Sequence, residues 1–262
     1  MWPATNFEFK YRFWIFGVIF WASFASYSLD RKNIVQWLLE WNPARHGGAP
    51  PDWQFHLTFA FAALLCLANA ALRTWGTAYL NAAVMVDGQV HTSRLLADGP
   101  YRYVRNPLYL GNVLLALGVG LMTSRLGFAI LVCGMIIYVY RLIAREEAGI
   151  LASQGESFRA YCAAVPRLLP ALRPRVPPAG AKPNWKDGFL GEAFMWVMVV
   201  AIAGFAVSLN LTIFWIALVS AFVVYGICYV VIRKSGGKPA ADRQPSSAEH
   251  SRKQTGAGDL HR

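Results

Sequence analysis

The feature that most constrains this chain is a series of six apolar stretches with almost no charge inside them. A helix needs about 20 apolar residues to cross a hydrocarbon core of about 30 Å, and each stretch reaches or approaches that length. The stretches are residues 13–29, 55–72, 108–123, 126–143, 194–209 and 211–232. We therefore predict an all-α, polytopic integral membrane protein with about six transmembrane helices.

Very short breaks separate two pairs of these stretches. Only Ser124 and Arg125 divide the third stretch from the fourth, and only Asn210 divides the fifth from the sixth. Helices joined by so few residues pack side by side and antiparallel. The sequence therefore predicts two tight helical hairpins.

The composition supports a membrane protein. Only 15% of the 262 residues are charged, against about 25% in soluble domains. The formal net charge of +11 could indicate a nucleic-acid partner, but basic loops facing anionic lipid headgroups explain it better in such an apolar chain. We expect membrane lipids as partners and no nucleic acid.

Nothing in the sequence indicates a metal site. The four cysteines form no CxxC pair, and three of them lie inside apolar stretches, where they act as small hydrophobic residues. The five histidines are scattered without the spacing of metal ligands. We expect no bound metal.

The basic residues predict an orientation. With six spans and a cytoplasmic N-terminus, 21 Lys and Arg residues face the inside and 4 face the outside. This asymmetry follows the positive-inside rule. We therefore expect a multi-pass membrane protein with both termini in the cytoplasm.

The remaining segments divide the chain. Three tryptophans and several prolines mark 30–54 as an interfacial segment within the N-terminal helical region 1–72. Residues 171–193 form a Pro-rich linker into the C-terminal hairpin 194–232, and the polar tail 233–262 is expected to be disordered.

The first candidate functional segment is residues 98–111, a turn followed by a helix start. Gly99 precedes a proline, Tyr101 and Tyr109 supply aromatic faces, and Asn106 stands just before Pro107, a good first helical residue. Free N–H groups at a helix start suit a carboxylate or phosphate, and tyrosine faces suit a cation or an adenine. The alternative is simple anchoring at the membrane surface.

The second candidate is the end of the fourth stretch. Arg141 and Arg145 lie one helical turn apart and suit a carboxylate or phosphate. Glu146 and Glu147 follow at a helix C-terminus, where the helix dipole disfavours them unless they have a partner. They therefore indicate a bound cation or a salt-bridge cluster, unless this is an ordinary solvated helix end.

The third candidate is residues 155–170. Phe158, Tyr161 and Val165 share one face of a short amphipathic helix that Pro166 ends. Arg167 then points at phosphates or at the preceding glutamate pair, or else anchors the segment at the membrane surface.

In this order, the three segments resemble the superfamily of isoprenylcysteine carboxyl methyltransferases and phospholipid methyltransferases. The matching residues are Leu95, Leu96, Gly99, Tyr101, Arg105, Asn106, Pro107, Tyr109, Gly111, Glu146, Glu147, Gly155, Phe158, Tyr161, Val165, Pro166 and Arg167. The resemblance implies a methyltransferase core at 73–170 that uses S-adenosyl-L-methionine at the cytosolic membrane surface. It also implies a lipid or lipidated small molecule as substrate.

The resemblance assigns roles to residues of this chain, although none to a catalytic group. Cofactor contacts carry over to Arg94, Leu95, Leu96, Gly99, Tyr101, Asn106, Pro107, Tyr109, and Glu146 or Glu147. Independently of the resemblance, the charge of Arg141, Arg145 and Arg167 suits a carboxylate or phosphate of the substrate, so we expect these residues to bind it. Asn106 and Arg94 stand where histidine is frequent in the family, which argues against a prenylcysteine substrate.

Two other classes stay open on the sequence alone. A membrane reductase of the sterol type would use NADPH, but the glutamate pair would then sit badly beside its phosphate. A non-catalytic scaffold or small transporter is the other alternative, although a translocation path usually needs polar groups within the spans. The chemical nature of the methyl acceptor also stays open.

Overall fold

The computed structural model describes residues 2–41, 49–87 and 97–235. All regular elements in these ranges are helices, with an isolated backbone bridge between Asn33 and Ser124. The helices are α1 (Asn6–Lys10), α2 (Arg12–Ala25), η1 (Ser26–Ser28), α3 (Ile34–Glu40), α4 (Asp52–Asp87), η2 (Gly99–Arg102), α5 (Pro107–Gly120), α6 (Arg125–Gln154), α7 (Glu156–Ala164), α8 (Trp185–Gly191), α9 (Ala193–Ser208) and α10 (Leu211–Ser235).

The chain divides into two compact units, residues 1–223 and 224–262. The first holds every helix up to the first half of α10. The second begins inside α10 and includes the whole predicted tail, 233–262. Of these tail residues, only the first three, which end α10, lie within the described ranges.

Within the part of the chain that the structure describes, two helices are long and apolar enough to cross a membrane, Asp52–Leu80 within α4 and Arg125–Gln154. The pair α8 and α9, bent by 59° at a break, makes a third if it counts as one span. Pro107–Gly120 and Leu211–Val224 are apolar but shorter. Of the six predicted spans, the structure therefore supports only two or three. A 14-residue helix such as α5 extends only about 21 Å, which is shorter than the hydrocarbon core of about 30 Å.

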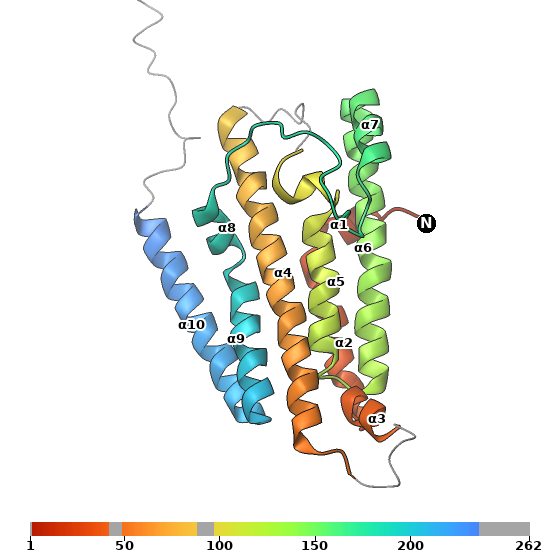
Figure 1. Cartoon of the computed structure of the whole chain (residues 1–262), viewed down its shortest axis with the longest axis vertical. Coiled ribbons are helices and arrows are strands. Elements are labelled where there is room, and N and C mark those ends of the chain that lie inside the picture. Colours follow the sequence, from red (N-terminus) through yellow and green to blue (C-terminus); the bar gives the residue numbers. More distant parts are fainter. Residues whose placement is uncertain (1, 42–48, 88–96, 236–262) are drawn as a thin grey trace, which may run out of the picture. The chain divides into compact units, whose positions relative to one another are not determined.

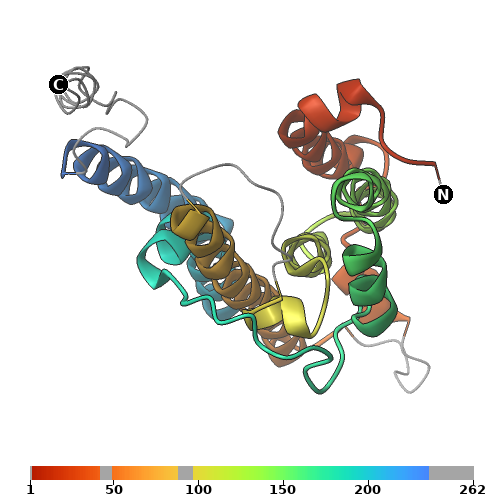
Figure 2. The same cartoon turned by 90° about the horizontal axis from the view of Figure 1, so that it is seen from above.

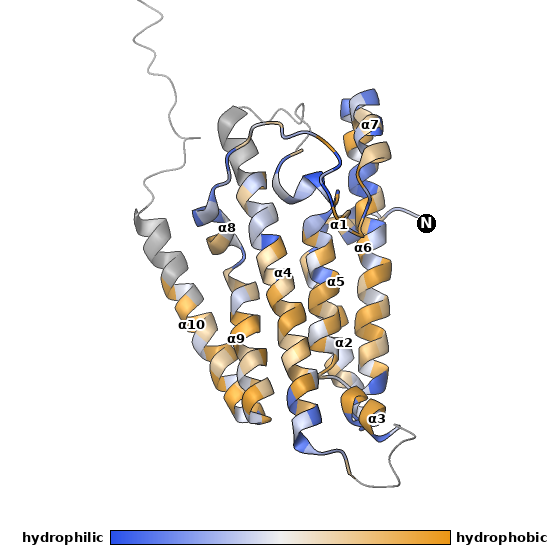
Figure 3. Ribbon diagram, viewed as in Figure 1, coloured by the Kyte–Doolittle hydropathy of each residue, from blue (hydrophilic) through white to orange (hydrophobic). Residues whose placement is uncertain are grey.

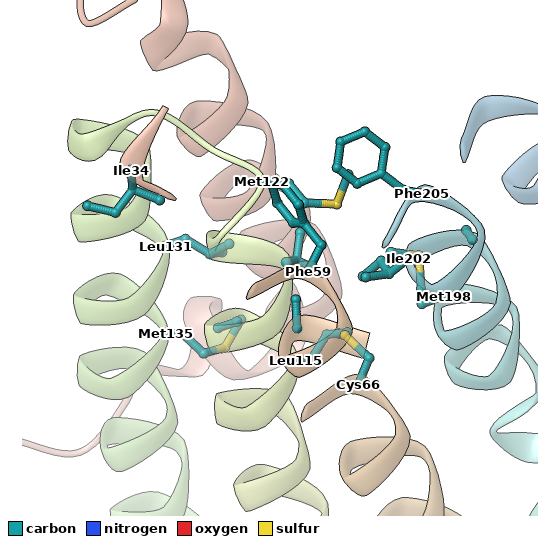
Figure 4. Close-up of a cluster of buried hydrophobic side chains, with 14 of the residues drawn as sticks. Ile34, Phe59, Cys66, Leu115, Met122, Leu131, Met135, Met198, Ile202 and Phe205 are labelled. Carbon is teal, nitrogen blue, oxygen red and sulfur yellow. The ribbon is translucent and has the colours of Figure 1, made fainter. Parts of the chain in front are cut away.

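Within the first unit, α4 packs against α5, α8 and α9, and α6 packs against α5 and α2. Viewed from above, α5 lies between α4 and α6 (Figure 2). The core between them is apolar and includes Phe59, Cys66, Leu115, Met135 and Ile202 (Figure 4). Many exposed residues on the helices are also aromatic or aliphatic, and the ribbon coloured by hydropathy is largely orange along the middle of α4, α6 and α9 (Figure 3). This is the pattern expected when the surroundings are lipid.

The antiparallel pair of α5 and α6 has two distinct ends. At the turn end, residues 121–124 join the helices, and Ser124 caps α6 by accepting from the Gly127 N–H at 3.0 Å. Arg125 pairs there with Asp30 at 2.9 Å and holds the pKa of Asp30 at about 2. At the opposite end, called the site end below, α5 begins and α6 continues toward α7. Here η2 and the segment after α7 cross the top of the bundle (Figure 1).

Candidate cofactor and substrate site

The turn before α5 is built on Gly99, which has a φ of +54°. A Cβ at this position would lie 2.4 Å from the Tyr79 ring of α4. Glycine is therefore required both by the left-handed backbone and by the close approach of α4. The turn buries Tyr101, whose carbonyl oxygen accepts a hydrogen bond of 2.7 Å from the Tyr161 hydroxyl of α7. Burial raises the pKa of both phenols, so both stay neutral donors at neutral pH.

Asn106 links the start of α5 to the two later segments. Its side-chain Nδ2 donates to Glu147 Oε1 at 3.2 Å and to the Arg167 carbonyl at 3.0 Å. The side chain does not cap α5, and Pro107 occupies the first helical position. The first turn of α5 thus keeps free N–H groups at the site end.

Glu147 is the point at which the three candidate segments meet. Its carboxylate is buried, with a residue exposure of 9%. Arg167 Nη2 lies 2.7 Å from Oε2, and Arg105 Nε lies 3.5 Å from Oε1. The predicted salt-bridge cluster is therefore present, and its cations come from the chain itself.

Glu146 has a different environment. It is half-buried, and its Oε1 accepts a hydrogen bond of 2.8 Å from the Tyr109 hydroxyl of α5. Adjacent residues of a helix point about 100° apart. The two glutamates therefore face different sides of α6. Among the described residues, Glu146 forms no salt bridge within 4.0 Å, and Arg12 is the cation that acts on it electrostatically.

Arg141 and Arg145 do not join this cluster. Arg141 Nη2 donates to both oxygens of Glu8, at 2.9 and 2.7 Å, and Arg145 donates to the Ala4 carbonyl and to Asn6 Oδ1 at 3.0 and 2.6 Å. The N-terminal segment 4–8 therefore covers the face of α6 that the sequence suggested for substrate. Of the other predicted contacts, Arg94, Leu95 and Leu96 lie outside the described residues.

The segment after α7 is fixed to the turn by hydrogen bonds that the sequence reading missed. The buried Asp98 carboxylate accepts from the N–H groups of Ala179 and Ala181 at 2.8 Å. Arg102 Nε donates to the Val176 carbonyl at 2.9 Å. The signal for Asp98 was its place just before the Gly-Pro turn, where an acidic side chain meets backbone N–H groups easily.

A second missed feature lies between α4, α5 and α9. Arg73 Nε and Nη2 donate to the two Glu192 oxygens at 2.6 and 3.1 Å, and Thr77 donates to the same carboxylate at 2.7 Å. Arg73 Nη1 also donates to Asn112 at 2.7 Å. The sequence contained one signal for this pair, because both charged residues border apolar stretches. Arg73 directly follows 55–72, and Glu192 lies just before 194–209.

The depth of the cluster follows from helix geometry. Between Arg125 at the turn end and Glu147, α6 rises about 33 Å. The hydrocarbon core of a bilayer is about 30 Å thick. If the turn end sits at one membrane surface, the cluster lies at the headgroup layer of the other.

Comparison with known proteins gives one family. Residues 57–153 match the phospholipid methyltransferase family. The matched region runs from α4 to the end of α6 and contains the turn and both glutamates. Among the residues that the structure describes, no group of three or more His, Cys, Asp or Glu side chains could hold a metal ion.

Two curated relatives are named for metal resistance. The cobalt-zinc-cadmium resistance protein CzcN of Cupriavidus metallidurans is 32% identical over 90 residues, which are 34% of this chain and 41% of that protein. The nickel-cobalt-cadmium resistance protein NccN of Alcaligenes xylosoxydans is 28% identical over 119 residues, 45% of this chain and 55% of that protein. The chain thus spans about half the length of these relatives. No solved structure matches it significantly.

Proposed function

Residues 57–153 of this chain belong to the phospholipid methyltransferase family, and on that premise we propose that the protein transfers a methyl group from S-adenosylmethionine to a membrane-embedded, lipid-like acceptor. The observation that carries the proposal is the meeting of three distant segments at the paired glutamates of α6. They come from the turn before α5, the end of α6 and the Val-Pro-Arg segment after α7.

The donor set fits the polar groups of this cofactor. Glu146, held by the Tyr109 hydroxyl, offers a carboxylate to an ammonium group. The N–H groups in the first turn of α5 offer donors to a carboxylate. The face of the half-buried Tyr109 suits an adenine or a sulfonium, whereas Tyr101 is buried in the turn.

The structure favours different roles for the two glutamates. Glu147 already binds Arg167 and Asn106 and pairs with Arg105, so its negative charge is balanced within the protein. We therefore assign it to positioning, since it holds the turn against the segment after α7. Glu146 is the better candidate for direct contact with the cofactor.

When bound, the cofactor supplies an electrophilic methyl group on a sulfonium. The chain's own contribution is to hold the acceptor in line with that group, which can supply most of the acceleration. A carboxylate acceptor needs no base, whereas an ammonium acceptor must first lose a proton. We assign no catalytic base to any residue.

The acceptor enters from the lipid in this proposal, because the cluster lies at headgroup depth. We also propose that the site end faces the cytoplasm, as the distribution of basic residues indicates. Arg141 and Arg145 remain proposed substrate contacts, but a carboxylate or phosphate would reach Arg141 only by displacing Glu8. Arg167 would have to share its charge with Glu147.

The test uses the purified full chain in lipid nanodiscs with methyl-labelled S-adenosylmethionine. We expect saturable cofactor binding and label in the lipid fraction. Base-labile label would identify a methyl ester, and base-stable label would identify N-methylation. Glu146→Gln should lose cofactor binding, while Glu156→Gln, at an exposed position on α7, should keep it. Saturable NADPH binding without S-adenosylmethionine binding would overturn the proposal in favour of a reductase.

A further inference from the structure

An open groove of about 400 Å³ lies beside the Val-Pro-Arg segment. Its walls come from the end of α7, from the segment that follows, and from Arg105 in the turn before α5. Lining residues include Cys162, Val165, Leu169 and Arg175. Two of the ten lining residues are arginines and none is acidic, so the groove suits an anion with an apolar part.

Arg105 is the reason to expect an anion there. Its side chain is only 11% exposed, and its Nε is buried without a hydrogen-bond partner among the residues that the structure describes. Glu147 lies 3.5 Å away, but it forms a shorter contact of 2.7 Å with Arg167. One carboxylate is thus shared between two guanidinium groups. A cation this deeply buried is costly unless further negative charge reaches it.

The backbone holds Arg105 in this position. Its N–H donates to the Pro166 carbonyl at 2.9 Å, so the arginine and the groove wall move together. On the other side, the Arg175 N–H donates to the Arg102 carbonyl at 2.8 Å. The two arginines are therefore held at the groove by main-chain contacts and are not placed there by flexible side chains alone.

The segment that forms the groove also presents apolar side chains to the surroundings. Leu169 is 77% exposed and Leu172 is 100% exposed, and Arg167, Arg173 and Arg175 lie in the same short segment. At headgroup depth, leucines can enter the acyl region while arginines remain beside phosphates. A soluble anion would leave both leucines in water.

We propose that this groove binds the phosphate of an anionic membrane lipid, with Arg105 and Arg175 on the phosphate and Leu169 and Leu172 beside its acyl chains. The groove shares no lining residue with the proposed cofactor site. The inference thus goes beyond the proposed function, and binding at this groove can be measured without methyl transfer.

The experiment compares lipid retention by matched variants. The full chain is purified in nanodiscs of phosphatidylcholine mixed with phosphatidylglycerol, and native mass spectrometry counts the lipids that stay bound after release. We expect retained phosphatidylglycerol at several times its share of the mixture. Arg175→Gln should reduce this excess several-fold. Arg173→Gln removes the same charge from the same segment but does not line the groove, so it should preserve the excess. Equal retention by the two variants would overturn the proposal.

Two further arms separate the source of the phosphate and check the position. Competition by millimolar inorganic phosphate would show a site for the free ion and would also overturn the lipid assignment. Cys162 is half-buried and lines the groove, so phosphatidylglycerol should slow its alkylation by N-ethylmaleimide, with the site read by peptide mass spectrometry. Arg175→Gln should abolish that slowing. Equal alkylation rates in phosphatidylcholine nanodiscs with and without phosphatidylglycerol would place any retained lipid elsewhere and overturn the proposal.

Discussion

Arg167 Nη2 lies 2.7 Å from Glu147 Oε2, although the two residues come from different segments on either side of α7. The carboxylate is nearly enclosed, with 11% of its side chain exposed, while 45% of the Arg167 side chain is exposed. Glu147 also accepts a hydrogen bond from Asn106 and pairs with Arg105. The Glu147 carboxylate is therefore shared between Arg105 and Arg167, and neither arginine pairs with it alone.

This asymmetry predicts unequal costs for the two sides of the pair. Glu147→Gln leaves two guanidinium groups without their anion and should destabilise the fold by about 3 kcal/mol, as when a buried pair loses one partner. Arg167→Gln removes a half-exposed group and should cost about 1 kcal/mol. Thermal unfolding of both variants in one detergent measures the difference. The exposed pair of Arg159 and Glu156 supplies control variants with no expected effect. A larger cost for Arg167→Gln would contradict Glu147 as the shared partner.

For Glu146 we expect a substitution to affect cofactor binding strongly and stability little, the opposite of Glu147. Glu146→Gln should weaken S-adenosylmethionine binding at least tenfold, about 1.4 kcal/mol, with little change in melting temperature. Tyr109→Phe removes the single hydroxyl that orients the carboxylate and should weaken binding by a smaller factor. Isothermal titration of the purified variants gives both dissociation constants. If Glu147→Gln abolished binding at full stability while Glu146→Gln did not, the assigned roles would be reversed.

The sequence predicted the local structure around the candidate site where its signals are local. The Gly99 turn, the start of α5 at Pro107 and the glutamate pair are all readable within a few residues, and their meeting place could be inferred from the family motif. The partner of Arg141 could not, because Glu8 lies 133 residues away in a segment without a pattern. Charge alone does not say whether an arginine faces a ligand or its own chain.

The helices were predicted less well at their ends than in their interiors. Hydropathy placed the second stretch at 55–72, but α4 continues to Asp87 because residues such as Thr74 and Trp75 are polar or amphipathic and still helical. The third stretch, 108–123, includes turn residues, and α5 ends at Gly120. Apolar composition does not distinguish a helical residue from one in a buried turn.

The Arg73–Glu192 pair predicts strong coupling between α4 and α9. Glu192→Gln should cost about 3–5 kcal/mol, since it strands a guanidinium with only 17% of its side chain exposed. Replacing both residues by methionine should cost less than the single change, because no buried charge remains. A double-mutant cycle of Arg73→Met, Glu192→Met and the double variant, measured as free energies of unfolding, tests this. Additive costs would mean that the two side chains do not depend on each other.

Gly99 and Gly155 form a matched pair for testing the turn. Both have positive φ, +54° and +56°, but a Cβ at Gly99 meets the Tyr79 ring at 2.4 Å and a Cβ at Gly155 meets nothing within 4 Å. Gly155→Ala should therefore cost about 1 kcal/mol of backbone strain. Gly99→Ala should cost more and should also weaken cofactor binding, because Tyr101 would shift. Equal melting temperatures for the two variants would show that α4 yields to the added methyl group.

The contact of Glu8 with Arg141 predicts a pH dependence of stability. A hydrogen bond from the Thr5 backbone, followed by the Arg141 side chain, lowers the pKa of Glu8 from 4.5 to about 2. A carboxyl group with a lowered pKa stabilises the fold at pH values above its ordinary pKa of 4.5. This contribution disappears as the pH falls toward 2. At neutral pH, Glu8→Gln should therefore be less stable than the unsubstituted protein, by less than about 1 kcal/mol, because the pair is partly exposed to solvent.

The gap between the two proteins should close as the pH falls from 4.5 toward 2, because protonated Glu8 resembles glutamine in charge. Melting temperatures of both proteins across this range give the comparison, and Arg141→Gln should show the same closing gap, since it removes the other half of the contact. A gap that stayed constant with pH would mean that segment 4–8 is held by its backbone bond from the Ala4 N–H to the Arg141 carbonyl at 3.0 Å. The carboxylate would then contribute nothing to holding the N-terminus on α6.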